Sequence, residues 1–252
     1  MSNHPSQPAD PRSWAALRRY TSARIAIGRA GCGLPTKAHL EFQAAHARAR
    51  DAVQAELHVD AIMEALSAFG APVYAVQSAA PNRQVYLRQP NLGRLLSAES
   101  KAQLSEPMIA PDVVIVIGDG LSSVAVERNA IPVLTLLWPR LKNLAYLLGP
   151  IVVATQARVA LADQIGELLQ AKLSLIMIGE RPGLSTADSL GLYLTYGPRV
   201  GRVDSERNCI SNVRDGGMNS EAAATQALDL IKSMFAHRAS GVLLSKNRIG
   251  RI

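Results

Sequence analysis

The residue best placed to do chemistry is a carboxylate that directly follows an apolar segment. Glu180 stands in the motif Gly179-Glu-Arg-Pro-Gly183, after a run of residues that is typical of a buried strand. A carboxylate at such a position can accept hydrogen bonds from a large ligand that carries amide groups, and Val159, in a turn after another apolar segment, can supply apolar contact. An ion pair of Glu180 with Arg181 or Arg158 is the structural alternative, and the sequence leaves both open.

Cys209, in Arg207-Asn-Cys-Ile-Ser211, is the second candidate. A neighbouring arginine can lower the pKa of a thiol, but none of the five histidines lies at the expected sheet edge to act as a base, so a nucleophile is not favoured. A small residue that fills a gap is the structural alternative. The chain also lacks the usual zinc-site, P-loop, dinucleotide-binding and nucleophile-elbow motifs. We therefore predict ligand binding, with no catalytic residue and no metal site in this chain.

Three apolar, β-branched segments predict the elements that position these residues. They are residues 112–117, 151–155 and 173–178. Helical patterns lie between them, over residues 121–148, with breaks at Pro132 and Pro139, and over residues 159–169. This alternation is typical of a Rossmann-like, doubly wound parallel sheet of the α/β class, and right-handed crossovers bring the carboxyl ends of its strands to one edge. Ligands of open α/β sheets bind at that edge.

The remaining segments surround this sheet. Residues 12–37 are expected to form an arm interrupted by glycine and proline, and a long helix should follow from Thr36 to about Glu56. Further expected elements are a helix over 60–69, an edge or connecting strand over 73–76, a polar, arginine-rich loop over 197–217 and a last helix over 220–237. We divide the chain into a helical N-terminal segment, residues 1–56, and an α/β domain, residues 57–252.

The composition narrows the classes of partner. The chain has 252 residues, 48% of them hydrophobic, which suits a sizeable core and excludes disorder of the whole. Most of the net charge of +7 lies at the two ends, and aromatics are only 4%, so nucleic acid is not an expected partner. The basic N-terminal segment could bind an acidic subunit or phosphate, or simply be solvated. No apolar run approaches a membrane span, and no export signal is present, so the expected location is the cytoplasm.

Ordered motifs along the chain resemble the small subunit of adenosylcobalamin-dependent ethanolamine ammonia-lyase. They are Leu17-Arg-Arg-Tyr-Thr-Ser-Ala-Arg24-Ile, Gly28-Arg-Ala-Gly31, Pro35-Thr-Lys, His46-Ala-Arg-Ala-Arg50-Asp-Ala-Val53, Gln156-Ala-Arg-Val-Ala160, Ile178-Gly-Glu-Arg-Pro-Gly183-Leu-Ser, Asp188-Ser-Leu-Gly191 and Asp204-Ser-Glu-Arg-Asn-Cys-Ile-Ser-Asn212. Each motif is weak alone, but together they are specific and run from about Trp14 to Leu243. The resemblance implies a Rossmann-like α/β domain with a helical N-terminal segment, as the strand pattern also predicts.

The resemblance also implies a cofactor and a partner. Val159, Glu180 and Cys209 match the family positions that contact adenosylcobalamin, so residues 57–252 would be the cobalamin-binding domain. The partner would be a TIM-barrel large subunit that holds the substrate, and residues 1–56 would dock on it within a hetero-oligomer. The chain has no Asp-x-His-x-x-Gly motif, so the cofactor is expected to bind base-on, with its own dimethylbenzimidazole as lower ligand.

The activity implied by the resemblance is that of an ammonia-lyase that works only in the complex. It converts ethanolamine to acetaldehyde and ammonia by a radical mechanism, and this chain would form one wall of the cofactor site. Residues before Pro11 match nothing in the family, which leaves location in a bacterial microcompartment open. A stand-alone Rossmann-like protein that binds a nucleotide or an adenosyl ligand is the alternative function, and a scaffold protein on nucleic acid is a third.

Overall fold

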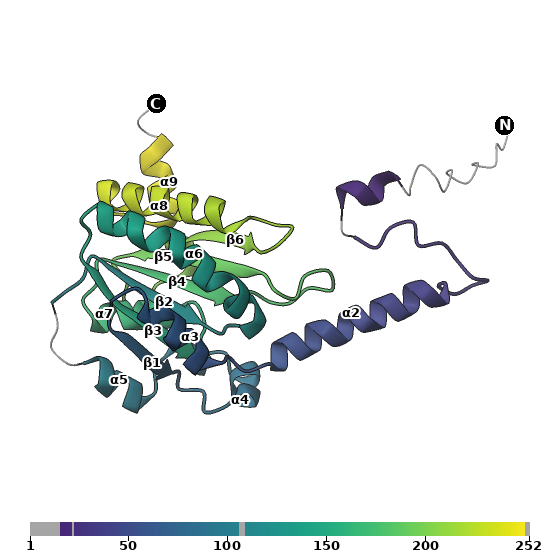
Figure 1. Ribbon diagram of the computed structural model, residues 1–252, viewed down its shortest axis with the longest axis horizontal. Helices are drawn as coiled ribbons and strands as arrows, with labels where there is room; N and C mark the ends of the chain where they lie inside the picture. The colour runs from purple at the N-terminus through teal and green to yellow at the C-terminus, as the bar shows by residue number, and fades with distance from the viewer. Residues whose placement is uncertain (1–15, 22, 106–108, 250–252) are drawn as a thin grey trace.

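One six-stranded sheet organises the molecule, with helices on both of its faces (Figure 1). The computed structural model describes residues 16–21, 23–105 and 109–249, so the predictions for residues 1–15 and 250–252 lie outside it. The strand order is β1-β3-β2-β4-β5-β6. The strands are β1 (Val73–Gln77), β2 (Val113–Gly118), β3 (Leu148–Thr155), β4 (Leu173–Gly179), β5 (Leu190–Tyr196) and β6 (Asn208–Val213).

The helices divide between the two faces of the sheet. The α-helices are α2 (Thr36–Gln54), α3 (Val59–Ser67), α4 (Arg83–Arg88), α5 (Ala98–Leu104), α6 (Ser123–Asn143), α7 (Leu161–Leu168), α8 (Ser220–His237) and α9 (Gly241–Ile249), and the 3-10 turns are η1 (Arg18–Tyr20), η2 (Leu92–Arg94) and η3 (Asp204–Glu206). Residues of α3, α6 and α8 form the core on one face, and residues of α5 and α7 form the core on the other. None of the described helices is long and apolar enough to cross a bilayer.

Four parallel strands confirm the centre of the predicted sheet. β2 lies between β3 and β4 and is parallel to both, and β1 is the predicted edge strand, parallel to β3. Valine and isoleucine fill β2, and all six of its residues are buried, because helices cover it on both sides. The carboxyl ends of the four parallel strands therefore lie at one edge, as expected.

The prediction of a Rossmann-like, doubly wound parallel sheet is confirmed only in part, because the parallel arrangement does not extend to β5 and β6. β5 runs antiparallel to β4, and β6 runs antiparallel to β5, so the sheet is mixed. β6 also falls within the segment 197–217 that was expected to be a loop. β5 alternates, with Leu190, Leu192 and Leu194 in the core shared with α6 and α8. Such a strand needs a hydrophobic partner on one face only.

The helix breaks expected at Pro132 and Pro139 are absent, because helix α6 continues through both prolines. A proline inside a helix removes one backbone hydrogen bond and costs about 3 kcal/mol. Burial offsets that cost: Leu134, Leu137 and Leu141 are fully buried, and each such side chain contributes about 2 kcal/mol. Helix α8 has the predicted bounds, 220–237.

The N-terminal segment extends from the rest of the molecule (Figure 1). Helix α2 begins at Thr36 as predicted, although Pro35, not Thr36, is its N-cap residue, and no side chain caps it. Only two of its residues, Ala45 and Ala52, are buried. Leu40 and Phe42 are exposed by 57% and 41%. The role of residues 1–56 in docking stays a prediction.

Candidate functional site

Asp119 holds together two loops at the carboxyl edge of the parallel strands. It follows β2, and its carboxylate accepts hydrogen bonds from the backbone N–H groups of Gln156 and Ala157, each at 2.8 Å. These donors belong to the turn after β3, which carries Val159. Arg83 donates a further hydrogen bond to Asp119 at 3.1 Å. Asp119 is buried, and this desolvation raises the pKa of its carboxyl, while the hydrogen bonds and Arg83 oppose the rise.

Arg83 connects the same edge to the end of helix α2. Its Nη1 also donates to the carbonyl of Gly120 at 2.8 Å, and its Nε donates to the carbonyl of Val53 at 2.7 Å. Its Nη2 is buried without a hydrogen-bond partner among the described residues. The ring of Tyr86 lies 4.8 Å from the guanidinium, and its hydroxyl donates to the carbonyl of Ala157 at 2.9 Å. The turn before Val159 is thus fixed from two sides.

Two glycines bring Glu180 to this edge. The backbone at Gly120, after β2, passes very close to the backbone at Gly179, at the end of β4. A Cβ added to Gly120 would lie 2.2 Å from the Gly179 carbonyl oxygen. A Cβ added to Gly179 would lie 2.0 Å from the carbonyl oxygen of Ser122. Because no side chain fits there, the chain after β4 passes directly over the β2 loop.

The Glu180 side chain is held by uncharged donors. Its Oε2 accepts hydrogen bonds from the hydroxyl of Ser189 and, at 3.3 Å, from the backbone N–H of Asn212. Among the described residues it forms no ion pair, so the alternative of a pair with Arg181 or Arg158 is wrong. Its Oε1 accepts no hydrogen bond from another described residue. This atom lies beside Gly191, 3.0 Å from the position that a Cβ on Gly191 would take. One carboxylate oxygen is therefore oriented and still available as an acceptor.

Beside Glu180, the face of β5 and β6 on the α7 side is only partly covered: Gly191 and Thr195 are buried, whereas Tyr193 is half-buried. α8 packs on the other face of both strands and α6 on that of β5, while α7 packs on β4. Gly191 and Tyr193 alternate with the core leucines of β5 and therefore point to the α7 side. Cys209 pairs with Tyr193 across the strands and is exposed, as is Ser211. Strand β6 is also the edge of the sheet, so this face continues to the molecular surface.

Tyr193 is central to this face, and the sequence analysis missed it. Its ring lies 2.9 Å from where a Cβ on Gly191 would be, next to Glu180. It packs against the same apolar cluster as Val159. Neighbouring atoms shield the Cys209 thiol even though part of the residue is accessible, and this desolvation raises the pKa of the thiol, while a hydrogen bond with Tyr193 opposes the rise. Desolvation likewise raises the pKa of Tyr193.

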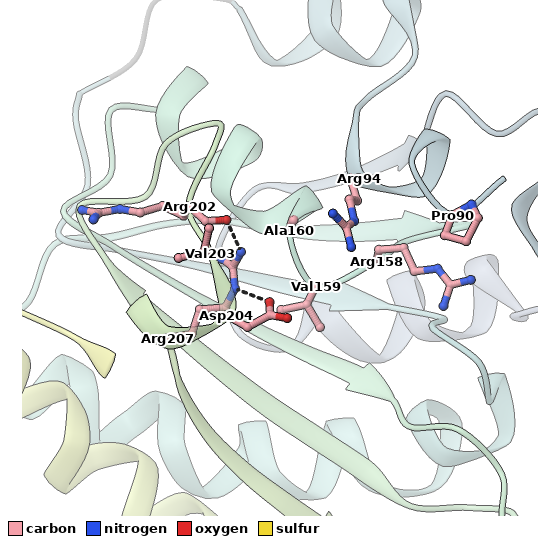
Figure 2. Close-up of a pocket in the computed structure, with 9 residues that line it drawn as sticks. All are labelled: Pro90, Arg94, Arg158, Val159, Ala160, Arg202, Val203, Asp204 and Arg207. Atoms are coloured by element: carbon pink, nitrogen blue, oxygen red, sulfur yellow. Dashed lines mark hydrogen bonds and ion pairs between the residues drawn. The ribbon is translucent and has the colours of Figure 1, made fainter. Parts of the chain in front are cut away.

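A cavity of about 320 Å³ lies next to Val159 (Figure 2). Its lining consists of Pro90, Arg94, Arg158, Val159, Ala160, Arg202, Val203, Asp204 and Arg207. Figure 2 shows Arg94 and Arg158 on one side of Val159, with Asp204 and Arg207 on the other. Arg207 is buried, and its guanidinium pairs with the buried Asp163 and, at 3.4 Å, with Asp204.

The structure places the three predicted residues on one side of the sheet. Val159 and Tyr193 share an apolar cluster, Tyr193 pairs with Cys209, and Glu180 adjoins Gly191 beneath the Tyr193 ring. A partly covered, mostly neutral face with one available acceptor suits a large ligand with an apolar body and amide groups. In the described part of the chain, no group of three or more His, Cys, Asp or Glu side chains could hold a metal ion.

Comparisons with known proteins agree on one family. The ethanolamine ammonia-lyase light chain (EutC) family matches residues 11–245. An ethanolamine ammonia-lyase small subunit of Azotobacter vinelandii is 49% identical over 241 residues, covering 94% of this chain and 89% of the relative. Those of Ralstonia nicotianae and Pseudomonas syringae pv. tomato are 47% and 48% identical, covering 92% and 94% of this chain and 88% and 83% of the relatives. The chain belongs to the ethanolamine ammonia-lyase light chain family.

Proposed function

We propose that the chain is the small subunit of an ethanolamine ammonia-lyase and forms one wall of an adenosylcobalamin site at the interface with a large subunit. The observation that carries the proposal is the partly covered face of β5 and β6, which gathers Val159, Glu180 and Cys209 around Tyr193. The assembled enzyme would convert ethanolamine to acetaldehyde and ammonia. The chain alone would be inactive, because it would supply one wall of the cofactor site and no contact with the substrate.

The residues present fit a corrinoid. Glu180 Oε1 has no donor among the described residues, and an amide at the rim of a corrin ring is a suitable one. The half-buried Tyr193 and the exposed Cys209 would contact the body of the ring. When bound base-on, the cofactor supplies a carbon-centred radical through homolysis of its cobalt–carbon bond. Glu180 and Val159 would orient the ring, and the closed interface would exclude water.

The N-terminal segment supports a docking role. Leu40 and Phe42 of α2 are exposed, and Arg24 donates to the carbonyl of Leu184, in the loop that follows Glu180, at 3.3 Å. A large subunit, expected to be a TIM barrel, would cover both this arm and the partly covered sheet face. We place the hetero-oligomer in the cytoplasm, with a bacterial microcompartment as the open alternative.

The proposal is tested by co-expressing the chain with the large subunit and recording ultraviolet-visible spectra of the purified complex after addition of cobalamin. We expect the complex to retain a corrinoid that neither subunit retains alone. Glu180→Ala should weaken retention about tenfold, as expected for a lost hydrogen bond to a charged group, while the subunits still assemble. The matched control is Glu64→Ala on α3, an exposed carboxylate remote from the sheet edge.

Two results would contradict this function. Unchanged cobalamin affinity in Glu180→Ala would show that the site is wrongly placed. Binding of an adenosine nucleotide by the isolated chain, without corrinoid binding in the complex, would favour the stand-alone nucleotide-binding protein instead.

A further inference from the structure

The four arginines that line the cavity beside Val159 differ in their partners. Arg207 is neutralised by the buried Asp163. Arg202 forms an ion pair with Glu206, and its Nε and Nη2 donate to main-chain carbonyls. Figure 2 shows Arg202 extending away from the cavity. Neither group therefore offers an uncompensated charge to a ligand.

Arg94 and Arg158 are different because they keep unused donors. Within the described ranges, the side chain of Arg94 forms no hydrogen bond and no ion pair, and Figure 2 shows its guanidinium pointing into the space beside Val159. Arg158 Nε is buried without a hydrogen-bond partner among the described residues, and its Nη2 reaches only the carbonyl of Tyr86, at 3.4 Å. Figure 2 shows the Arg158 guanidinium pointing away from Val159, on the Pro90 side of the cavity, so the two positive charges border the cavity at different points. Asp204 lies on the other side of Val159, next to Arg207.

Close packing at Gly93 fixes the turn of Arg94 against the turn of Arg158. A Cβ added to Gly93 would lie 2.9 Å from Arg158 Cγ and 2.9 Å from the ring of Tyr86. The Arg158 backbone N–H donates to the Gly93 carbonyl at 2.8 Å, and the Arg158 guanidinium lies 4.2 Å from the centre of the Tyr86 ring. Since the turns that carry Arg94 and Arg158 pack directly on each other, a ligand that binds both needs little rearrangement of the chain.

We propose that Arg94 and Arg158 bind a phosphate ester in this cavity. Guanidinium groups bind phosphate through paired, charge-assisted hydrogen bonds. Val159 and Ala160 also line the cavity, and their backbone N–H groups have no acceptor among the described residues, which adds donors to the two arginines. The source of the ester rests on the proposed function: it is the phosphodiester of the cobalamin nucleotide loop, while the corrin ring lies on the adjoining sheet face.

The test compares two non-reactive corrinoids on the co-expressed complex. Cyanocobalamin carries the phosphodiester, and dicyanocobinamide lacks the whole nucleotide loop. We expect Arg94→Gln to weaken cyanocobalamin binding about tenfold in spectroscopic titrations and to leave dicyanocobinamide binding unchanged. Arg94→Lys should recover part of the loss, because it keeps the charge. Arg88→Gln, an exposed arginine on α4 that does not line the cavity, is the matched control and should change neither affinity.

The possible outcomes separate this inference from the proposed function. If the wild-type complex binds neither corrinoid, the proposed function itself is wrong. If it binds both and Arg94→Gln loses both equally, or loses neither, Arg94 does not bind the phosphate. A third arm titrates ADP into the chain without its partner. Binding there that Arg94→Gln abolishes would show that the ester comes from a free nucleotide and would overturn the assignment to cobalamin.

Discussion

Tyr193 and Cys209 add no charge to the sheet face beside Glu180. Desolvation raises the pKa of both the phenol and the thiol, so both stay protonated at neutral pH. A protonated thiol is a poor nucleophile, and neither residue places an unpaired charge beneath a ligand. The face therefore suits a ligand whose reactive centre must not meet a nucleophilic side chain, as the proposed radical chemistry requires.

The raised pKa of Cys209 predicts a slow alkylation reaction. Alkylation proceeds through the thiolate, and a thiol whose pKa lies above its ordinary value has a smaller thiolate fraction at about pH 8. In a Cys32→Ser background, we expect the rate of iodoacetamide labelling of Cys209 to keep rising with pH beyond about pH 9, where an ordinary thiol levels off. Tyr193→Phe should slow labelling further at about pH 8, because it removes a hydrogen bond that lowers the pKa of the thiol. Mass spectrometry of timed samples measures both rates.

Free glutathione, labelled under the same conditions, is the reference for an ordinary thiol. A labelling rate that levels off at the same pH for Cys209 and glutathione would contradict the raised pKa, and faster labelling in Tyr193→Phe would contradict the role of the hydrogen bond.

At this scale the sequence predicts candidate site residues most directly where they follow a recognisable strand. Glu180 could be predicted because a buried apolar run ends just before it. Tyr193 could not, because its position depends on the antiparallel return of β5, which a local pattern does not specify. Arg94 was missed because a 3-10 turn far away in sequence packs against the turn after β3. The alternation of leucines from Leu190 to Leu194 indicates a strand there, but not that this strand returns beside Glu180.

At the scale of elements, the loop after β2 passes so close to the end of β4 that we expect no side chain to be tolerated at Gly120. Gly120 has a φ of 58°, and a Cβ on it would lie 2.2 Å from a backbone carbonyl oxygen. We expect Gly120→Ala to lower the free energy of unfolding by about 2–4 kcal/mol, the sum of overpacking and left-handed strain. Because the loop carries Asp119 and crosses the chain before Glu180, cobalamin binding in the complex should fall as well.

The variant Gly70→Ala measures the cost of left-handed backbone strain without overpacking. Gly70 has a similar φ of 66°, but no atom lies within 4 Å of an added Cβ, so we expect a loss of only about 1 kcal/mol. Urea denaturation followed by circular dichroism measures both variants. Equal losses for the two glycines would mean that the close approach at Gly120 tolerates a methyl group and does not fix the position of Glu180.

The elements that the sequence predicts well are those with unambiguous local patterns. The apolar runs of β2, β3 and β4 and the bounds of α8 required no knowledge of the partner segments. The prolines of α6 gave a misleading signal, because the burial that offsets their cost is a tertiary effect. The polar residues of β6 hid a strand that needs to be apolar on one face only. The missed strand β6, together with the antiparallel return of β5, accounts for the expectation of a parallel sheet with a loop beside it.

At the scale of the whole molecule, the N-terminal segment touches the candidate site at two places. Arg83 links the carbonyl of Val53, near the end of α2, to Asp119, and Arg24 bonds the carbonyl of Leu184 in the loop after Glu180. A partner that orders this segment would also stabilise the loops around the cofactor face. By linkage, cofactor binding should then strengthen association of the subunits to the same degree.

The exposed apolar residues of α2 provide the test of that arrangement. Leu40 and Phe42 lie outside the core, so Leu40→Glu or Phe42→Glu should leave the thermal unfolding of the chain unchanged. We expect each to weaken association with the large subunit at least about tenfold, because an apolar anchor at an interface would be replaced by a charge. Size-exclusion chromatography with light scattering measures the complex, with Gln54→Glu, at the exposed end of α2, as the control for added charge. Full assembly of both variants would contradict docking through α2, because neither substitution leaves an apolar side chain at its position.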